Sequence, residues 1–252
     1  MKTSRLINRR HALITGLTSV SGLLISGCSR KLPPTYGNIL RMGDTLTYAA
    51  HRALLAEQSL AREYSHKDIT SFPAIGTTDP GDPSKPRSSE TYRRLQSGAF
   101  AEWRLAVEGL VARPGFYSLA DLKRFPSRTQ VTRHTCEEGW SAIAEWTGVP
   151  LSRVLDAAGM LRVARFVSFY SYDGWADCID MLDALHPQTL LAYGMNGQDL
   201  SVPHGAPVRL RVERQLGYKN MKYIERIVVR DEFDDGGKNG SIQNGWSWYT
   251  GI

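Results

Sequence analysis

The sequence has few cysteines and lacks the common metal-binding and redox motifs. Only Cys28, Cys136 and Cys178 occur among its 252 residues, and there is no CxxC pair, no HExxH motif and no His-rich cluster. A structural zinc site needs several Cys or His ligands at short spacings, so we do not expect one. The sequence also has no haem-attachment motif, so any electron transfer would involve a separate redox protein.

Long basic runs and internal repeats are also missing. Lys and Arg number 31 against 25 Asp and Glu, which gives a formal charge of +6, but no five basic residues stand together. The positive balance suits an anionic partner, whereas the scatter of the charges argues against nucleic acid. With 42% hydrophobic residues the chain can form a sizeable core of its own.

The first 28 residues have the pattern of an export signal. Basic residues precede a short apolar stretch from Ala12 to Gly27 that is rich in Gly, Ser and Thr, which favours cleavage over membrane anchoring. Arg9 and Arg10 form the pair of a twin-arginine signal, although Ala12 stands where that signal usually has Phe.

The end of this leader resembles a lipoprotein box, Leu24-Ile25-Ser26-Gly27-Cys28. In such a box the cysteine is lipidated and becomes the new N-terminus; ordinary cleavage nearby, with a free Cys28, is the alternative. We therefore predict a leader over residues 1–28, a single domain over 29–252, and a periplasmic protein held to the membrane by lipid.

Apolar periodicity and turn residues predict an α+β fold of short strands with a few helices. The expected strands cover residues 103–111, 128–133, 164–171, 207–213 and 223–231, with a hairpin over 190–202 that turns at Asn196-Gly197. The expected helices cover residues 40–64, a short segment that begins at Ser118, a segment that ends at Ala158, and 180–185. An irregular loop is expected over 71–89, and a tail packed on the core or on a partner over 234–252.

Cys136 is the candidate centre of the chemistry because its neighbours are polar at the end of a predicted strand. Three interpretations are open. His134 lies two residues away on the same strand face and could activate the thiol in a cysteine hydrolase; Cys178 could form a disulfide with Cys136; or Cys136 could be a metal-bound thiolate. The chain offers no second obvious soft ligand, so a metal's other ligands would come from a cofactor.

Five basic residues cluster late in the sequence: Arg209, Arg211, Arg214, Lys219 and Lys222. Arg and Lys together with backbone N–H groups are typical of phosphate recognition, and Gly217 would let the backbone approach an anion closely. A solvated, charged hairpin is the alternative.

Four stretches of the sequence together resemble one known family. They are Thr135-Cys136-Glu137-Glu138-Gly139-Trp140-Ser141, Leu191–Gly197, Gly205–Leu210 and Gly217–Lys222. In order and approximate spacing they are similar to the sulfite-oxidase-like molybdopterin oxidoreductases, over about residues 70–231. The resemblance is to the exported bacterial branch, which includes the catalytic subunit of the periplasmic methionine-sulfoxide reductase.

The resemblance implies the sulfite-oxidase-like molybdopterin-binding fold and a molybdenum–molybdopterin cofactor, with molybdenum held by the pterin dithiolene and by Cys136. Glu138 matches an acid near the metal. Further cofactor contacts are implied at Gly76, Thr77, His134, Ser171, His204, Arg209, Asn220, Met221 and Lys222. Among these, Arg209 and the 220–222 segment match phosphate-binding positions, His204 stands where exported relatives often have Asn, and Ser171 stands where relatives have Thr.

The expected function is oxygen-atom transfer to or from a small sulfur- or nitrogen-oxide substrate. The cofactor performs the two-electron chemistry, and electrons would pass to or from a membrane cytochrome or quinone-linked partner. The alternative is a non-catalytic periplasmic lipoprotein that binds an anionic ligand.

Overall fold

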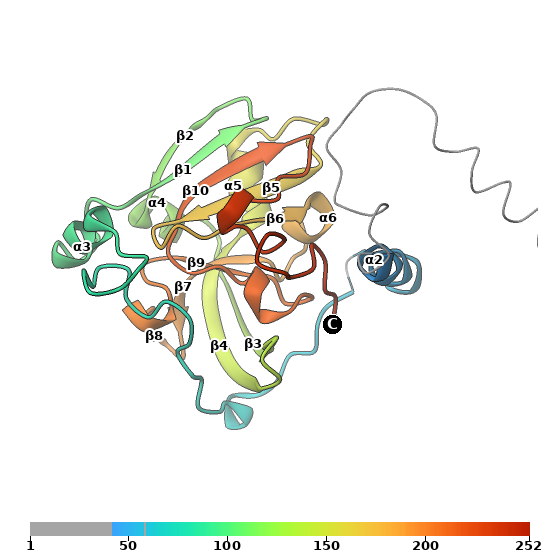
Figure 1. Cartoon of the computed structure of the whole chain (residues 1–252), viewed down its shortest axis with the longest axis horizontal. Helices are drawn as coiled ribbons and strands as arrows, with labels where there is room; N and C mark the ends of the chain where they lie inside the picture. The colour runs from blue at the N-terminus through green and yellow to red at the C-terminus, as the bar shows by residue number, and fades with distance from the viewer. Residues whose placement is uncertain (1–41, 58) are drawn as a thin grey trace, which may run out of the picture. The chain divides into compact units, whose positions relative to one another are not determined.

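Two five-stranded sheets form the framework of the molecule. The structure is a computed structural model that describes residues 42–57 and 59–252; the predicted leader and Cys28 lie outside the described residues. The first sheet contains, in spatial order, β2 (Gly115–Ser118), β1 (Arg104–Gly109), β10 (Ile224–Arg230), β5 (Phe166–Ser171) and β6 (Ala176–Asp180). The second contains β3 (Arg128–Thr135), β4 (Ser141–Pro150), β7 (Leu190–Met195) and β8 (Gln198–Asp199), with β9 (Arg209–Arg211) also paired to β7. Figure 1 shows the two sheets one above the other.

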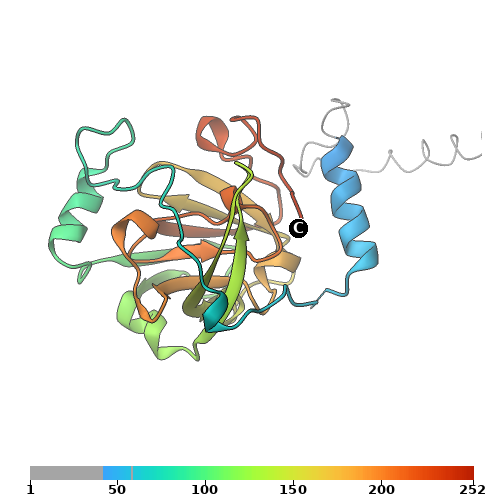
Figure 2. The same ribbon diagram turned by 90° about the horizontal axis from the view of Figure 1, so that it is seen from below.

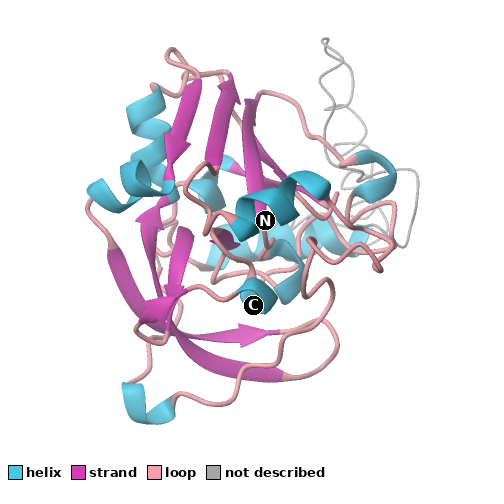
Figure 3. Cartoon of the chain, turned by 90° about the vertical axis from the view of Figure 1, so that its left-hand side faces the viewer, coloured by secondary structure: helices cyan, strands magenta, loops and turns pink. Residues whose placement is uncertain are grey.

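Short helices connect and flank the strands. The α-helices of the described residues are α2 (Met42–Leu54), α3 (Glu90–Ser97), α4 (Leu119–Arg124), α5 (Leu151–Ala158) and α6 (Met181–Ala184). Single 3-10 turns occur at η2 (His66–Asp68), η3 (Val202–His204), η4 (Gly217–Lys219) and η5 (Gly237–Asn239). Figure 3 shows the short helices arranged around the strands. The predicted α+β class of short strands and a few helices is confirmed.

The main core lies between the sheets and α5. It joins Leu105 of β1, Ile227 of β10, Leu191 of β7 and Leu155 of α5, all of them fully buried. Strands β1 and β10 pair in parallel with Ala106 opposite Arg226, whereas the other strand pairs are antiparallel. Strands about 120 residues apart in the sequence are therefore needed to close this core.

Several local predictions are confirmed by the backbone. Ser118 and Asp121 form a reciprocal capping box at the start of α4, and Gly159 ends α5 with φ of 71°. Asn196 and Gly197 both have positive φ, 51° and 75°, as a two-residue hairpin turn between β7 and β8 requires.

The predicted helix over residues 40–64 is too long. Helix α2 ends at Leu54, and the chain after Ser59 runs in extended form beside β3, where Glu63 forms a bridge with Thr132 and the Tyr64 N–H donates to Val131 O at 2.8 Å. Residues 59–64 are extended although the segment contains strong helix formers, because their backbone groups form hydrogen bonds with the edge of β3.

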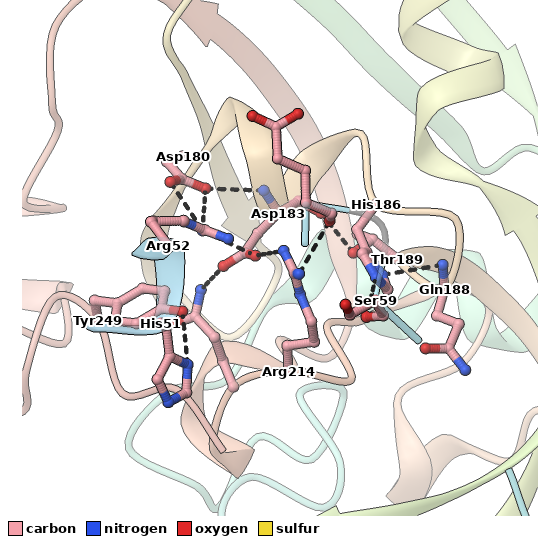
Figure 4. Close-up of polar contacts among 12 residues, drawn as sticks. His51, Arg52, Ser59, Asp180, Asp183, His186, Gln188, Thr189, Arg214 and Tyr249 are labelled. Carbon is pink, nitrogen blue, oxygen red and sulfur yellow. Dashed lines mark hydrogen bonds and ion pairs between the residues drawn. The ribbon is translucent and has the colours of Figure 1, made fainter. Parts of the chain in front are cut away.

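A buried ionic network holds α2 against α6. The Arg52 guanidinium lies 3.0 Å from both Asp180 and Asp183, and Arg214 lies 2.8 Å from Asp183 (Figure 4). Gln215 donates a further hydrogen bond to Asp183, at 2.5 Å. Because Asp183 is fully buried, its charge depends on these donors.

None of the described helices is both long enough and apolar enough to cross a bilayer.

Asp183→Ala should lower the free energy of unfolding by about 3–5 kcal/mol, since it removes the carboxylate that the buried Arg214 and the partly buried Arg52 share. Urea denaturation followed by fluorescence measures the change. The matched control is Asp199→Ala, whose carboxylate is 84% exposed in its ion pair with Lys123 and which should cost less than about 1 kcal/mol. Equal losses in the two variants would show that the Asp183 network has no special structural role.

Candidate functional site

A cavity of about 390 Å³ brings together segments that are far apart in the sequence. Its wall includes the turn between β3 and β4, the loop over residues 72–77, η3, β9 and the segment after η4. Of the residues predicted for the site, the cavity is lined by Gly76, Thr77, His134, Cys136, Glu138, His204, Arg209, Asn220, Met221 and Lys222. The structure thus gathers ten positions that were assigned from separate sequence motifs.

Cys136 lies in a tight turn directly after β3. Its N–H donates to Trp140 O at 2.9 Å and its carbonyl accepts from the Gly139 N–H at 3.1 Å, while Gly139 has φ of 89°. The side chain is only 4% exposed, and the thiol lies 3.5 Å from a Glu137 carboxylate oxygen. Burial, followed by the nearby Glu137 carboxylate, raises the pKa of the Cys136 thiol to about 11. This environment does not make the free thiol a nucleophile.

The cysteine-hydrolase interpretation is not supported by the surroundings of His134. Arg211 donates to His134 Nδ1 at 2.8 Å, and because Arg cannot accept, Nδ1 is the unprotonated nitrogen. Burial and the charges of Arg211 and Arg209 lower the pKa of His134 far below its usual value, which makes it a poor base. The thiol is hydrogen-bonded to Glu137 rather than to His134.

The disulfide interpretation is wrong for this structure. Cys136 and Cys178 are both free and buried. Cys178 lies on β6 of the other sheet and packs with Phe166, Phe233 and Trp248, so it belongs to a separate apolar cluster and not to the cavity.

Arg209, which is buried, and Lys222, which is half-buried, bring two cations to the cavity without a carboxylate partner. Arg209 is 4% exposed and donates to His204 O and Asn220 O, each at 2.9 Å, while its Nε has no hydrogen-bond partner. Lys222 Nζ donates to the carbonyls of Ile75, at 2.8 Å, Thr77 and Pro203. Burial and the Arg209 charge lower the pKa of Lys222 to about 7. An anion in the cavity would relieve both groups.

The other members of the basic cluster have structural partners. Arg211 bonds to Glu213 at 2.8 Å, Arg214 to Asp183 at 2.8 Å, and Lys219 to Asp177 at 2.6 Å. All three are buried, so the alternative of a solvated charged hairpin is wrong. Arg209 and Arg211 share one strand face, because both lie over the Trp146 ring at 5.0 and 4.4 Å.

Phe72 connects the loop over residues 72–77 to the cavity wall. Its ring lies 5.2 Å from His134, 5.9 Å from Trp140 and 5.8 Å from His204, measured between centroids. The Phe72 carbonyl lies 3.2 Å from His204 Nε2. Gly76 has φ of 66° with open space around it, and the Thr77 carbonyl accepts from Lys222 and from the Tyr223 hydroxyl.

Gly217 lines the cavity and has a packing role that the sequence did not predict. A Cβ built on it would lie 2.8 Å from both Glu137 Oε2 and His134 Nε2. The absence of a side chain therefore leaves room for the residues around Cys136. Next to it, Asn220 accepts from the Val212 N–H at 2.8 Å, which fixes the strand that carries Arg209 and Arg211.

Ser171 is the predicted site residue that does not line the cavity. Its hydroxyl bonds to Asp173 at 2.5 Å and to Trp175 O at 3.0 Å. Ser171 shapes the turn that carries Asp173 and Trp175, and these two do line the cavity.

Several cavity residues were not assigned to the site from the sequence: Phe72, Arg87, Glu137, Trp140, Asp173, Trp175, Pro203, Tyr218 and Trp246 are among them. Trp246 stacks on Tyr218 at 5.5 Å and 21°, and Arg87 lies 5.2 Å from the Trp175 ring. Tryptophans near Cys136 and in the tail were the signal that could have pointed to Trp140 and Trp246.

The residues around the cavity fit an anionic cofactor that carries its own metal ligands. Among the described residues no three His, Cys, Asp or Glu side chains form a metal site by themselves, so Cys136 could supply only one soft ligand. The unpartnered Arg209 Nε and the Lys222 ammonium would suit a phosphate.

Comparison with known proteins decides the family. A model of the oxidoreductase molybdopterin binding domain matches residues 94–237, more than half of the chain.

The chain belongs to the molybdopterin-binding oxidoreductase family.

Individual members of the family are similar over different lengths. A putative protein-methionine-sulfoxide reductase subunit of Azospira oryzae is 41% identical, over 60% of this chain and 56% of the relative. A protein-methionine-sulfoxide reductase catalytic subunit of Xanthomonas axonopodis is 30% identical, over 86% of this chain and 69% of the relative. The corresponding subunit of Ralstonia nicotianae is 32% identical, over 60% and 50%. The chain thus spans about half the length of two of these curated relatives.

A solved structure of the same kind extends this likeness to the fold. The sulfane dehydrogenase SoxCD of Paracoccus pantotrophus superposes with a TM-score of 0.52 at 25% identity, over 55% of this chain and 40% of that chain. The predicted family, the sulfite-oxidase-like fold, the oxidoreductase class and the molybdopterin cofactor are confirmed. The roles assigned to individual residues stay predictions.

Cofactor retention should fall as pH rises from 6 to 9, because the ammonium form of Lys222 binds the anion and its pKa without an anion is about 7. Lys222→Met should lower retention roughly tenfold or more at pH 6, and Lys222→Arg should keep retention but flatten its pH profile, since Arg stays charged. Molybdenum per mole of protein after dialysis measures this. The control is the exposed Lys85→Met, which should behave as the wild type. An unchanged profile in Lys222→Arg would contradict this role.

Proposed function

We propose that this protein is an exported, lipid-anchored oxidoreductase that transfers an oxygen atom to or from a small sulfur- or nitrogen-oxide substrate. The observation that carries the proposal is one cavity lined both by the buried thiol of Cys136 and by the unpaired cations Arg209 and Lys222. A soft metal ligand and an anion site in the same cavity are what a molybdenum–molybdopterin group requires. The family assignment favours this enzyme over a non-catalytic binding lipoprotein.

The residues around the cavity divide into two sets of roles. Cys136 would hold molybdenum through its sulfur. Arg209 and Lys222, which backbone carbonyl groups hold in position, would bind the pterin phosphate. When bound, the cofactor supplies the two-electron redox change and the open coordination position. The tight turn of Cys136, closed by the Trp140 carbonyl, fixes where the sulfur points.

The substrate side of the cavity is aromatic and acidic. Trp140 donates its indole N–H to Glu138 at 3.2 Å, which orients the carboxylate that the resemblance places near the metal. The relatives are named for methionine sulfoxide, which supports a sulfoxide as the oxygen donor. In that direction two electrons and two protons enter, the S–O bond breaks, the sulfoxide becomes a thioether, and the oxygen leaves as water.

Cys136→Ser should lose molybdenum and activity together, because a hydroxyl is a poor soft-metal ligand. Elemental analysis of protein made with its own maturation machinery, combined with dye-linked sulfoxide reduction, measures both losses. Cys178→Ser is the matched control, since it changes a buried free cysteine that lies outside the cavity. Retention of molybdenum and activity in Cys136→Ser would show that the ligand assignment is wrong.

The electrons should come from or go to a membrane-bound cytochrome or quinone-linked partner, and a lipid anchor at Cys28 would keep the enzyme close to it. Purified holoenzyme added to membranes of its own host should change the redox state of a membrane cytochrome or of the quinone pool when a sulfoxide is supplied. The Cys136→Ser protein is the negative control. No difference between holoenzyme and variant would count against a membrane redox partner.

A further inference from the structure

The fully exposed positions of helix α2 and of the two residues after it are all apolar or glycine, and the first exposed charge that follows is Glu57. Between residues 42 and 56, the exposed positions are Met42, Gly43, Leu46, Ala49, Ala50, Ala53, Leu54, Leu55 and Ala56. Leu46 is 66% and Leu54 82% exposed. Six of these positions, Met42, Leu46, Ala49, Ala50, Ala53 and Leu54, recur at helical spacing on one side of α2, and we call them the α2 apolar face.

The polar and aromatic side of the same helix is the side that faces the protein. Arg52 pairs with Asp180 and Asp183, and the Tyr48 ring lies 5.0 Å from both Trp248 and Tyr249. Figure 4 shows Arg52 reaching the two aspartates, with His51 beside Tyr249. These contacts determine which side of α2 points outward.

This orientation is the reverse of that of an ordinary surface helix, which buries its apolar side and exposes its polar side. Of the exposed large hydrophobic side chains in the described part of the chain, five fall between residues 42 and 60: Met42, Leu46, Leu54, Leu55 and Leu60. A concentrated apolar surface of this kind marks an interaction site. The described residues provide nothing that covers it.

We propose that the α2 apolar face lies on the surface of a lipid bilayer, in the plane of the interface. The predicted lipid attachment at Cys28 is separated from Met42 only by residues 29–41, which could span at most about 50 Å, so the face stays near the membrane. The 13-residue helix is too short to cross a bilayer. Its outer side carries no charge, because Asp44 is buried and Arg52 points inward. A charge-free apolar face costs little to place at the lipid interface.

The consequence is that the domain would hold one orientation on the membrane instead of rotating freely on its tether. The C-terminal segment lies against the inner side of α2, with Tyr249 3.3 Å from His51 (Figures 1 and 2). The same segment carries Trp246, which lines the cavity. This inference depends on the proposed membrane location but not on the cofactor or the reaction.

A polarity-sensitive fluorophore tests the contact directly. Full-length processed protein carrying Ala50→Cys is labelled with nitrobenzoxadiazole and combined with vesicles of phosphatidylethanolamine and phosphatidylglycerol; Cys136 and Cys178 are buried. The emission should shift to the blue, and lipid-borne nitroxide should quench it several-fold more strongly than a probe at Glu90→Cys. Glu90 is exposed at the start of α3, on the opposite side of the molecule from α2 (Figures 1 and 2).

Two substitutions complete the design. Leu46→Glu combined with Leu54→Glu should return the Ala50 probe to aqueous emission, whereas Phe116→Glu, at an apolar side chain that is 75% exposed on β2, should not. Dye-linked activity should be unchanged in both, which separates this inference from the proposed reaction. An Ala50 probe that stays aqueous on vesicles overturns the proposal. So does a shift that occurs only with native membranes, because it would identify a membrane protein as the partner.

Discussion

The balance of buried charge is the constraint on which this structure depends. Arg211, Arg214 and Lys219 are buried and each is matched by a carboxylate within 2.8 Å, whereas Arg209 and Lys222 are matched only by carbonyl oxygens. A carbonyl dipole satisfies a donor but does not neutralise its charge. The fold therefore keeps two positive charges that no carboxylate neutralises. Both lie at the cavity that Cys136 lines. An anion bound in this cavity would neutralise the two charges.

The position of the sulfur depends on backbone geometry more than on neighbouring side chains. The turn after β3 needs Gly139 at positive φ, and the surrounding side chains need Gly217 to have no Cβ. Arg211 holds His134 through a hydrogen bond while it also pairs with Glu213. Arg211, which the sequence suggested as a phosphate ligand, thus holds His134 in place in the cavity wall near Cys136.

The sequence predicted the strands that have a simple apolar pattern and missed those that do not. Strand β4 was not expected, because its Ala142–Trp146 stretch is buried on both faces and contains Glu145, so it shows no alternation. Helix α3 was missed because it buries only Tyr92 and Leu95. Motif resemblance located ten cavity residues, but Arg87, Asp173 and Trp246 could not be found in this way. They reach the cavity through loops whose paths depend on tertiary packing.

The parallel pairing of β1 with β10 has a consequence for the timing of folding. The central strand of the first sheet, β10, is synthesised about 120 residues after its partner β1, as the pairing of Ala106 with Arg226 shows. Long-range pairing of this kind makes folding slow, because the long loop must close, at a cost in entropy, before the stabilising contacts can form. The first sheet therefore cannot be completed until residues 224–230 have been synthesised. Until then β5 and β1, which lie on either side of β10, have no strand between them.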